Sequence, residues 1–322
     1  MTESNRPPLG RGALDRDAAT RADQELLSAA WCDPRARLLR IRGVEVPVVA
    51  RADGDDAGVR LALVPTEGDY VAARDGGAAG HLYLGRIAGA PVFGEAVRAA
   101  GADGDGDERA SADPVSGGTW RHPFEIGDAL EDTERELIAV LSALAAWHAS
   151  APRSSRDGSA TDVILGGWAR RDARGAELFP RTDPAVIVVI EHRDRILLGS
   201  NALWEAGRFS LLAGFVEAGE SLEQAVSREV FEESGMRLDE IRYVASQPWP
   251  FPRSLMLGFT AKLADDQDPD ALVADPEEIS ELRWFTRDEL RNPVEGLILP
   301  MPLSIARWLI DRWIDAGDVH AD

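Results

Sequence analysis

Several residue types that support common kinds of site are scarce in this chain of 322 residues. It has a single cysteine, Cys32, so it cannot form an internal disulfide or a zinc site built from four thiolates. The five histidines are scattered without metal-ligand spacing, and neither a Walker-type phosphate loop nor a G-x-S-x-G elbow occurs. No signal-peptide core or transmembrane run occurs either, so we expect a cytoplasmic protein that does not bind membranes.

Positive charge is also scarce. Lysine and arginine together number 35 against 56 aspartates and glutamates, which gives a formal net charge of −21. This excess argues against broad binding to nucleic acids, but it does not exclude one anionic nucleotide held through a metal ion. The hydrophobic content of 44% is that of a globular chain, and the length suggests about two domains.

The most informative pattern lies in residues 214–236, which read GFVEAGESLEQAVSREVFEESGM. Ser221 followed by Gln224 is a capping box, so a helix should begin near Leu222. Gly235 suits the left-handed residue that ends such a helix. The sequence therefore predicts a loop, a helix and a second loop.

Three glutamates of this helix, Glu229, Glu232 and Glu233, fall on or beside its apolar stripe rather than opposite to it. A solvated charged face, the usual interpretation, would point away from the core. Carboxylates at this spacing repel each other unless a cation lies between them, and oxygen ligands suit Mg²⁺ or Mn²⁺. The neighbouring Arg228 can pair with Glu220 and brace the entering loop.

This segment fits G-x5-E-x7-R-E-U-x-E-E-x-G-U, where U is a bulky aliphatic residue, at every specified position. It resembles the Nudix box of hydrolases that cleave a nucleoside diphosphate linked to another group. Residues 246–254 read SQPWPFPRS, which alone would suggest a proline-rich connector. After a complete box, they resemble the array that marks the NADH pyrophosphatase subfamily. The resemblance covers roughly residues 137–316.

The resemblance implies roles for single residues. Glu229, Glu232 and Glu233 would be catalytic, with Glu233 helping to activate water. The metal ligands would be these three and Glu278. Gly214, Glu220, Arg228 and Gly235 would be the structural positions of the motif. The implied substrate-binding residues are Phe179, Phe215, Gln247, Trp249, Ser254 and Ala306. Phe179 and Phe215 would sandwich a base ring, although either could equally be a core residue.

The chain departs from the subfamily in one segment. Many members carry a zinc ribbon with two C-x-x-C pairs just before the Nudix domain. Here the first pair falls at about Ser154 and Asp157, and the second near Asp172 and Arg174. We therefore predict no zinc, and we expect residues 151–179 to form a degenerate ribbon-like linker that holds together without metal or is mobile.

The predicted fold class is α/β. Residues 180–322 should form a Nudix α/β/α sandwich around a mixed sheet, after a β-rich N-terminal domain at 21–150 and a disordered tail at 1–20. In the C-terminal part, 185–191 and 195–198 predict a hairpin, 240–246, 255–263 and 282–285 strands, and 286–290 and 303–314 helices. In the N-terminal part, 36–42, 46–50, 60–65 and 81–87 predict strands, 132–148 a helix and 101–118 a loose loop.

The leading interpretation is an NAD(+)/NADH diphosphatase that uses Mg²⁺ or Mn²⁺. It would cleave the pyrophosphate of NADH, and more weakly of NAD⁺, to nicotinamide mononucleotide and AMP. The resemblance also implies removal of NAD caps from RNA 5′ ends and a homodimer. The alternatives are a broader dinucleotide or ADP-ribose pyrophosphatase, disfavoured by SQPWPFPRS, and a non-catalytic nucleotide sensor, disfavoured by the complete box.

Overall fold

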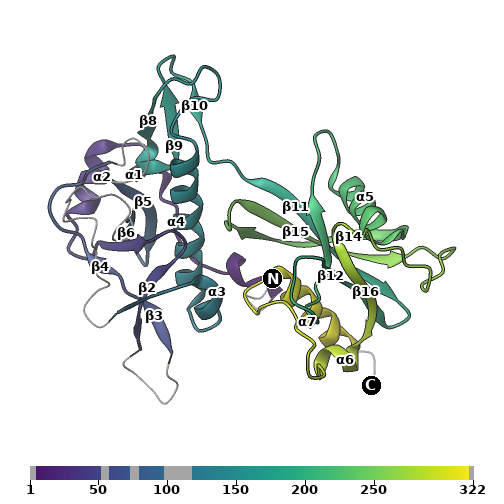
Figure 1. Cartoon of the computed structure of the whole chain (residues 1–322). Helices are drawn as coiled ribbons and strands as arrows, with labels where there is room; N and C mark the ends of the chain where they lie inside the picture. Colours follow the sequence, from purple (N-terminus) through teal and green to yellow (C-terminus); the bar gives the residue numbers. More distant parts are fainter. Residues whose placement is uncertain (1–4, 52–57, 73–79, 98–117, 319–322) are drawn as a thin grey trace. The chain divides into compact units, whose positions relative to one another are not determined.

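A computed structural model describes residues 5–51, 58–72, 80–97 and 118–318, which divide into two compact units (Figure 1). The C-terminal unit comprises the described residues of 1–10, 183–248 and 254–322. The N-terminal unit comprises those of 11–182 and 249–253. The predicted linker at 151–179 is thus part of the N-terminal unit, and the predicted Nudix boundary at residue 180 lies three residues before the observed one.

The C-terminal unit is built on a mixed sheet with the strand order β14-β15-β11-β12-β16. β11 runs parallel to β15 and antiparallel to β12, and β13 pairs with β11 outside this path. The predicted hairpin and strands are all present. The strands are β11 (Asp183–His192), β12 (Arg195–Asn201), β13 (Leu212–Phe215), β14 (Leu238–Trp249), β15 (Ser254–Leu263) and β16 (Ile279–Thr286).

Two helix layers cover this sheet. Along β11, Val186 and Val188 belong to the core under α5 (Leu222–Ser234), whereas Ile187 and Val189 belong to the core under α7 (Ile305–Asp318). Successive strand residues point to opposite faces, so a buried run of β-branched residues serves both layers. Figure 1 shows α5 and α7 on opposite sides of the sheet, and α6 (Arg287–Arg291) follows β16. The predicted α/β/α sandwich is confirmed.

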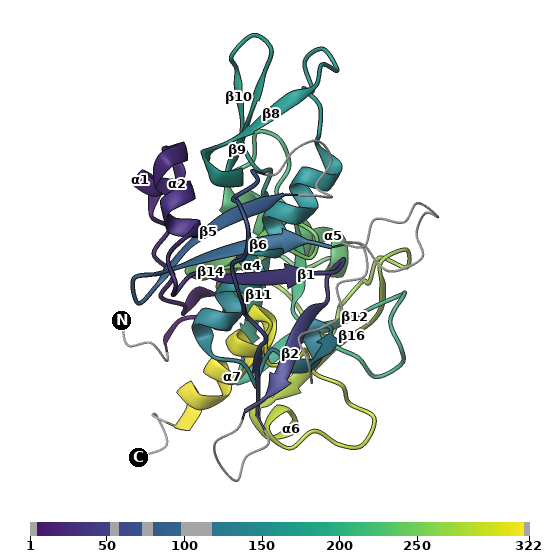
Figure 2. The ribbon, with the colours of Figure 1, turned by 90° about the vertical axis from the view of Figure 1, so that its left-hand side faces the viewer.

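Two sheets of the N-terminal unit have the orders β4-β1-β6-β5 and β3-β2-β7. Figure 2 shows β5, β6 and β1 side by side, and Leu137, Leu141 and Leu144 of α4 belong to the core beneath them. The strands are β1 (Arg37–Ile41), β2 (Val46–Ala50), β3 (Val59–Leu61), β4 (Val64–Pro65), β5 (His81–Ile87), β6 (Ala90–Ala96) and β7 (Thr119–Arg121). The helices are α1 (Ala18–Arg21), α2 (Gln24–Trp31), α3 (Pro123–Ile126) and α4 (Asp132–Ser150).

The sequence patterns missed β6 and β7 and merged β3 with β4. Within the predicted loop at 101–118, only residue 118 lies among the described residues. None of the helices in the described part of the chain combines the length and the apolar character needed to cross a membrane.

The prediction of a disordered tail is wrong for residues 5–20. A 3-10 helix, Pro8–Gly10, buries Leu9, and the Asp17 carboxylate caps α1 by accepting from the Thr20 backbone N–H. Asp17 also accepts from the Tyr83 hydroxyl at 2.7 Å and from Arg86 Nε at 2.6 Å. These partners lie far along the chain, so local composition could not reveal them.

The segment expected to be a degenerate ribbon forms a sheet of β8 (Thr161–Ile164), β9 (Ala169–Asp172) and β10 (Glu177–Leu178). The Arg170 guanidinium at its centre is fully buried. It donates to Thr161 Oγ1 at 2.6 Å, to the Thr161 carbonyl at 2.9 Å and to His148 Nδ1 at 3.0 Å. His148 Nε2 then donates to the Gly167 carbonyl at 2.8 Å. Burial lowers the pKa of His148 to about 4, so the ring is neutral at pH 7.

Polar contacts occupy the positions where the resemblance would place cysteines. The Ser154 backbone N–H donates to the Ser159 carbonyl, and Asp157 lies 3.6 Å from Arg174 as an ion pair. The Asp172 carboxylate accepts from the backbone N–H groups of Arg174 and Ala176, both at 2.9 Å. Turn hydrogen bonds and one ion pair therefore hold together the two turns where the resemblance would place the cysteine pairs.

Replacement of Arg170 tests this network. We expect Arg170→Met to destabilise the chain by about 3 kcal/mol, because it leaves buried acceptors on Thr161 and His148 without a donor. The matched control is Arg171→Met, since Arg171 is exposed and forms an ion pair with the exposed Glu177. Thermal melts compare the two, and an equal change in Tm would contradict the assignment.

The zinc prediction has a direct test. We expect elemental analysis of the purified chain to find no stoichiometric zinc, and EDTA to leave the melting of the N-terminal unit unchanged. One tightly bound zinc per chain would refute the prediction.

Candidate active site

The helix of the box has the predicted boundaries. α5 begins at Leu222, where Ser221 Oγ accepts from the Gln224 backbone N–H at 3.2 Å and Gln224 Oε1 accepts from the Ser221 backbone N–H at 2.8 Å. It ends at Gly235, which has a φ of 71°. A left-handed residue at this place closes the last turn without the steric cost of a Cβ atom. The prediction of both ends is confirmed.

Arg228 joins this helix to the loop that enters it. Its Nε and Nη2 lie 2.6 and 2.9 Å from the two carboxylate oxygens of Glu220, as the spacing predicted. Nη2 also donates to the Phe215 carbonyl at 2.9 Å. The hydrogen bonds from Arg228 hold the pKa of Glu220 at about 2. The end of β13 and the start of α5 are therefore fastened together.

The three glutamates differ in exposure. The side chain of Glu232 is 56% exposed, that of Glu229 is 14% exposed, and Glu233 is 7% exposed. Arg228 Nη1 lies 3.0 Å from the carboxylates of both Glu229 and Glu232. A solvated face describes Glu232 alone. The link from Arg228 to Glu232 has the i, i+4 spacing typical of helices and was visible in the sequence, but we did not predict it.

Gly214 leaves the room that the Glu229 carboxylate occupies. A Cβ atom built on Gly214 would lie between 1.9 and 2.2 Å from the three carboxylate atoms of Glu229. Any larger residue would displace this side chain. The φ of Gly214 lies outside the left-handed region, so its backbone conformation does not demand a glycine. A glycine is needed at this position because the Glu229 carboxylate occupies the space of a Cβ atom.

Negative charge is concentrated around Glu233. Burial, followed by repulsion from Glu229 and Glu278, raises the pKa of Glu233 to about 8, although a hydrogen bond from the Ala213 backbone N–H opposes this shift. Its Oε2 atom is buried without a hydrogen-bond partner. Burial is also the main cause of the raised pKa of Glu229. Glu278, which precedes β16, is close enough for its charge to act on both.

This donor set fits a divalent cation. Carboxylate oxygens are the ligands that Mg²⁺ and Mn²⁺ prefer, and a cation would relieve the repulsion at Glu233 and give its free oxygen a partner. Among the described residues, no three His, Cys, Asp or Glu side chains are grouped closely enough to hold a metal ion as they stand. Arg228 Nη1 holds one oxygen of Glu229 and one of Glu232, and it does not hold the second oxygen of either carboxylate.

Two predicted substrate-binding residues are inaccessible. Gln247 is fully buried, its Oε1 accepts from the Leu9 backbone N–H at 3.4 Å, and its Nε2 donates to the Leu303 carbonyl at 3.1 Å. Ala306 is 6% exposed and belongs to the core under α7. In the structure Gln247 supports its neighbours and Ala306 packs in the core, and the contacts of both with substrate stay predictions.

The remaining predicted contacts are more accessible. Phe215 at the end of β13 is 58% exposed, and Phe179, which follows β10 in the N-terminal unit, is 60% exposed. Their exposure excludes the alternative that either is a core residue of its unit. Ser254 is partly exposed at the first position of β15.

Trp249 has a partner that the sequence did not indicate. Its ring is stacked on Phe124 of α3, with centroids 5.3 Å apart and planes inclined by 17°. The ring of Phe251 meets Trp249 edge-on at 5.4 Å. Phe124 lies 125 positions earlier, and no periodicity or motif marks it.

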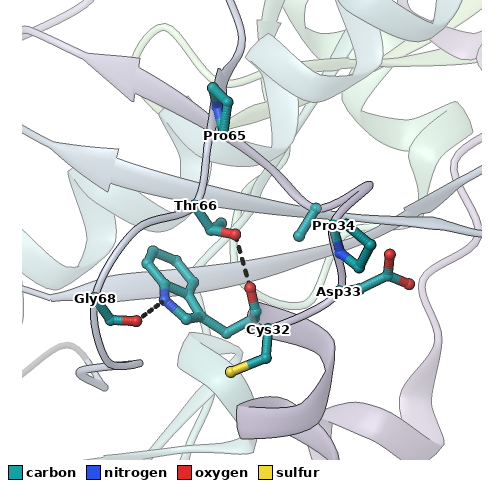
Figure 3. Close-up of a pocket in the computed structure, with 8 residues that line it drawn as sticks. Cys32, Asp33, Pro34, Pro65, Thr66 and Gly68 are labelled. Atoms are coloured by element: carbon teal, nitrogen blue, oxygen red, sulfur yellow. Dashed lines mark hydrogen bonds between the residues drawn. The ribbon is translucent and has the colours of Figure 1, made fainter.

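A cavity of about 210 Å³ in the N-terminal unit involves none of the predicted site residues (Figure 3). Its two sides are joined because Trp31 Nε1 donates to the Gly68 carbonyl and Thr66 Oγ1 donates to the Trp31 carbonyl. Its one carboxylate, Asp33, is engaged by Arg35 at 2.8 Å. It lacks the clustered acids of the box and is not the candidate active site. The lining residues are Trp31, Cys32, Asp33, Pro34, Ala36, Pro65, Thr66 and Gly68.

Comparison with known proteins found similarity in the C-terminal part of the chain and to a solved structure. Residues 181–305 match the NUDIX domain. The chain is similar to a NUDIX hydrolase from Nitrosomonas europaea of known crystal structure, with a TM-score of 0.41, 24% identity, and coverage of 52% of this chain and 93% of that one.

One named relative matches nearly the whole sequence, and another matches a shorter part at higher identity. An NAD-capped RNA hydrolase NudC of Mycobacterium bovis is 38% identical over 321 residues, which cover 95% of this chain and 94% of that protein. An NAD-capped RNA hydrolase NudC of Shigella dysenteriae is 47% identical over 133 residues, covering 41% of this chain and 48% of that protein. With the box, its carboxylates and a match along nearly the whole chain, this protein belongs to the Nudix hydrolases of the NudC type.

Proposed function

We propose that this chain hydrolyses the pyrophosphate bond of NADH, and more weakly of NAD⁺, and also removes NAD caps from RNA 5′ ends. Water adds across the P–O–P linkage, which yields AMP and nicotinamide mononucleotide, in its reduced form when NADH is the substrate. A capped RNA yields nicotinamide mononucleotide and an RNA with a 5′-monophosphate. The observation that carries the proposal is the complete set of box carboxylates in a chain that resembles an NAD-capped RNA hydrolase along 95% of its length. The array SQPWPFPRS supports the choice of substrate within the family.

In the proposed reaction, Glu233 accepts a proton from the attacking water. Burial and the neighbouring acids raise the pKa of this carboxyl in the metal-free fold, and a bound cation would favour the deprotonated form that can accept a proton. The chain holds it in place through the Ala213 backbone N–H and through its burial beneath α5. Arg228 and Gly214 position the adjacent Glu229.

The metal ligands in this proposal are Glu229, Glu232, Glu233 and Glu278. A bound Mg²⁺ or Mn²⁺ would neutralise the diphosphate and lower the pKa of bound water. We further propose that Phe215, which is exposed at the end of β13, stacks on a ring of the substrate. Phe179 and Ser254 stay predictions from the resemblance, as do the homodimer and the cytoplasmic location.

One assay separates the proposal from its alternatives. The chain is incubated with Mg²⁺ or Mn²⁺ and with NADH, NAD⁺, ADP-ribose, diadenosine polyphosphates or NAD-capped RNA, and the products are resolved by chromatography. We expect NADH or the capped RNA to be cleaved with the highest kcat/KM. A preference for ADP-ribose would support the broader pyrophosphatase, and no turnover of any substrate would support a sensor.

Substitution of Glu233 tests the proposed base. We expect Glu233→Gln to lower kcat at least about a hundredfold, because the amide cannot accept the proton. The matched control is Glu223→Gln, an exposed glutamate in the first turn of the same helix, which should keep kcat within about twofold. A Glu233→Gln enzyme within a few-fold of wild type would remove this carboxyl from the mechanism.

The stability of the metal-free chain gives a second test of Glu233. The pKa of Glu233 is about 8 in the folded chain, whereas its ordinary value is 4.5. Between pH 4.5 and pH 8 the folded chain therefore keeps a proton that the unfolded chain releases. The free energy of unfolding therefore falls as pH rises through this window. We expect Glu233→Gln in EDTA to melt on the order of 5 °C above wild type near pH 8, and close to it near pH 5.

Added Mn²⁺ should raise the Tm of the wild type more near pH 8 than near pH 6, because the ion binds the deprotonated carboxylate. It should raise the Tm of Glu233→Gln much less. If the difference in Tm between the wild type and Glu233→Gln stays constant with pH, Glu233 is not the group whose pKa is raised by burial.

A further inference from the structure

Glu278 is the one proposed metal ligand that lies outside α5. It belongs to the turn at residues 275–279, which leads into β16. We propose that Asp275 is a positioning residue for Glu278, and that it acts by fixing the backbone of this turn so that the Glu278 carboxylate can reach the cation. The proposal rests on the proposed function, since Glu278 is one of its metal ligands. All residues involved belong to the C-terminal unit.

Asp275 accepts hydrogen bonds from every backbone N–H group that follows it in the turn. Its Oδ1 atom accepts from the Glu277 N–H at 2.9 Å. Its carbonyl accepts from the N–H groups of Glu278 and Ile279 at 3.2 and 2.7 Å. The intervening Pro276 has no N–H group and a restricted φ. An aspartate side chain can replace a backbone acceptor in such turns, so this single residue satisfies the whole turn.

The turn is fastened on both sides. Before it, the Val273 N–H donates to the carbonyl of Ser234, the last residue of α5, at 2.9 Å. At its end, the N–H of Ala202, which follows β12, donates to the Glu278 carbonyl at 2.8 Å. Ile279 is 5% exposed and belongs to the core under α5. The backbone of Glu278 therefore has a defined position relative to the helix that carries the other three proposed ligands.

The side chain of Glu278 needs this support because it is exposed. Packing does not fix an exposed side chain, so the position of its backbone sets the region that the carboxylate can reach. That region lies near the acids of the box, because repulsion from Glu278 adds to burial in raising the pKa of both Glu229 and Glu233. Glu233 is 7% exposed, and its Oε2 atom has no hydrogen-bond partner. Asp275 therefore acts on this site through Glu278, and it is not itself a ligand.

The chain offers a matched control for this turn. Asp268 also precedes a proline, Pro269, in the same connection between β15 and β16. Its Oδ1 atom accepts from the Asp270 N–H at 3.0 Å, and its carbonyl accepts from the Ala271 N–H at 3.1 Å. The aspartate makes the same kind of contact in both turns, but the turn at Asp268 carries no proposed ligand.

The test measures Mn²⁺ binding to the full chain without substrate, from the electron paramagnetic resonance signal of the free ion. High ionic strength screens loose binding to the acidic surface. We expect Asp275→Ala to raise the Kd for Mn²⁺ about tenfold, the loss typical of a residue that orients a metal ligand. Asp275→Asn keeps the Oδ1 acceptor but not the charge, and it should stay within about twofold of the wild type. Asp268→Ala should also stay within about twofold.

A second comparison shows whether Asp275 acts through Glu278. We expect Glu278→Gln to raise the Kd about tenfold, because the neutral amide is a weaker ligand than the carboxylate. Adding Asp275→Ala to that variant should change the Kd by less than about twofold, since the turn then has no carboxylate to position. Melting in EDTA should give Asp275→Ala and Asp268→Ala the same Tm within about 2 °C.

Each outcome decides the proposal. It is overturned if Asp275→Ala binds Mn²⁺ as the wild type does, if Asp275→Asn or Asp268→Ala loses as much affinity as Asp275→Ala, or if the wild type binds no Mn²⁺. Losses that multiply in the double variant overturn it too, and so does a much lower Tm of Asp275→Ala, which would indicate general destabilisation. If the wild type binds Mn²⁺ but cleaves no dinucleotide, the proposed function fails, and the order of the Kd values still decides the role of Asp275.

Discussion

The crowding of carboxyl groups around the buried Glu233 at the end of α5 is the constraint on which the candidate site depends. Glu233 lies beneath the helix with one oxygen unpartnered, and its neighbours Glu229 and Glu278 raise its pKa further. Such an arrangement is unfavourable for folding in the absence of a counter-charge. Arg228 supplies part of that charge through Glu229, and the glycine at 214 makes the room. The motif therefore contains both the crowded carboxyl groups and the residues that accommodate them.

The features predicted from sequence are those set by near neighbours. The ends of α5 were predicted from Ser221, Gln224 and Gly235. The pairing of Arg228 with Glu220 was predicted from the spacing of the two residues along the chain. The strands of the C-terminal sheet other than β13 were also predicted, because runs of buried β-branched residues favour strands. Each of these depends on residues within about a dozen positions of one another.

The features that escaped prediction arise from contacts between distant parts of the chain. Gln247 is occupied by Leu9 and Leu303, which lie 238 and 56 positions away. Trp249 stacks on Phe124, and no local pattern distinguishes that phenylalanine from any other. A family motif identifies which positions have a role. It does not distinguish residues that contact a ligand from residues that hold their neighbours in place.

The ribbon-like segment carries a consequence for the environments in which the chain can work. Zinc ribbons depend on thiolates, which oxidants convert to disulfides or sulfenic acids with loss of the ion. Residues 151–179 contain no thiol, and the buried guanidinium of Arg170 joins their strands through groups that do not undergo redox chemistry. This part of the molecule should keep its shape during peroxide stress or zinc starvation, when a thiolate ribbon would come apart.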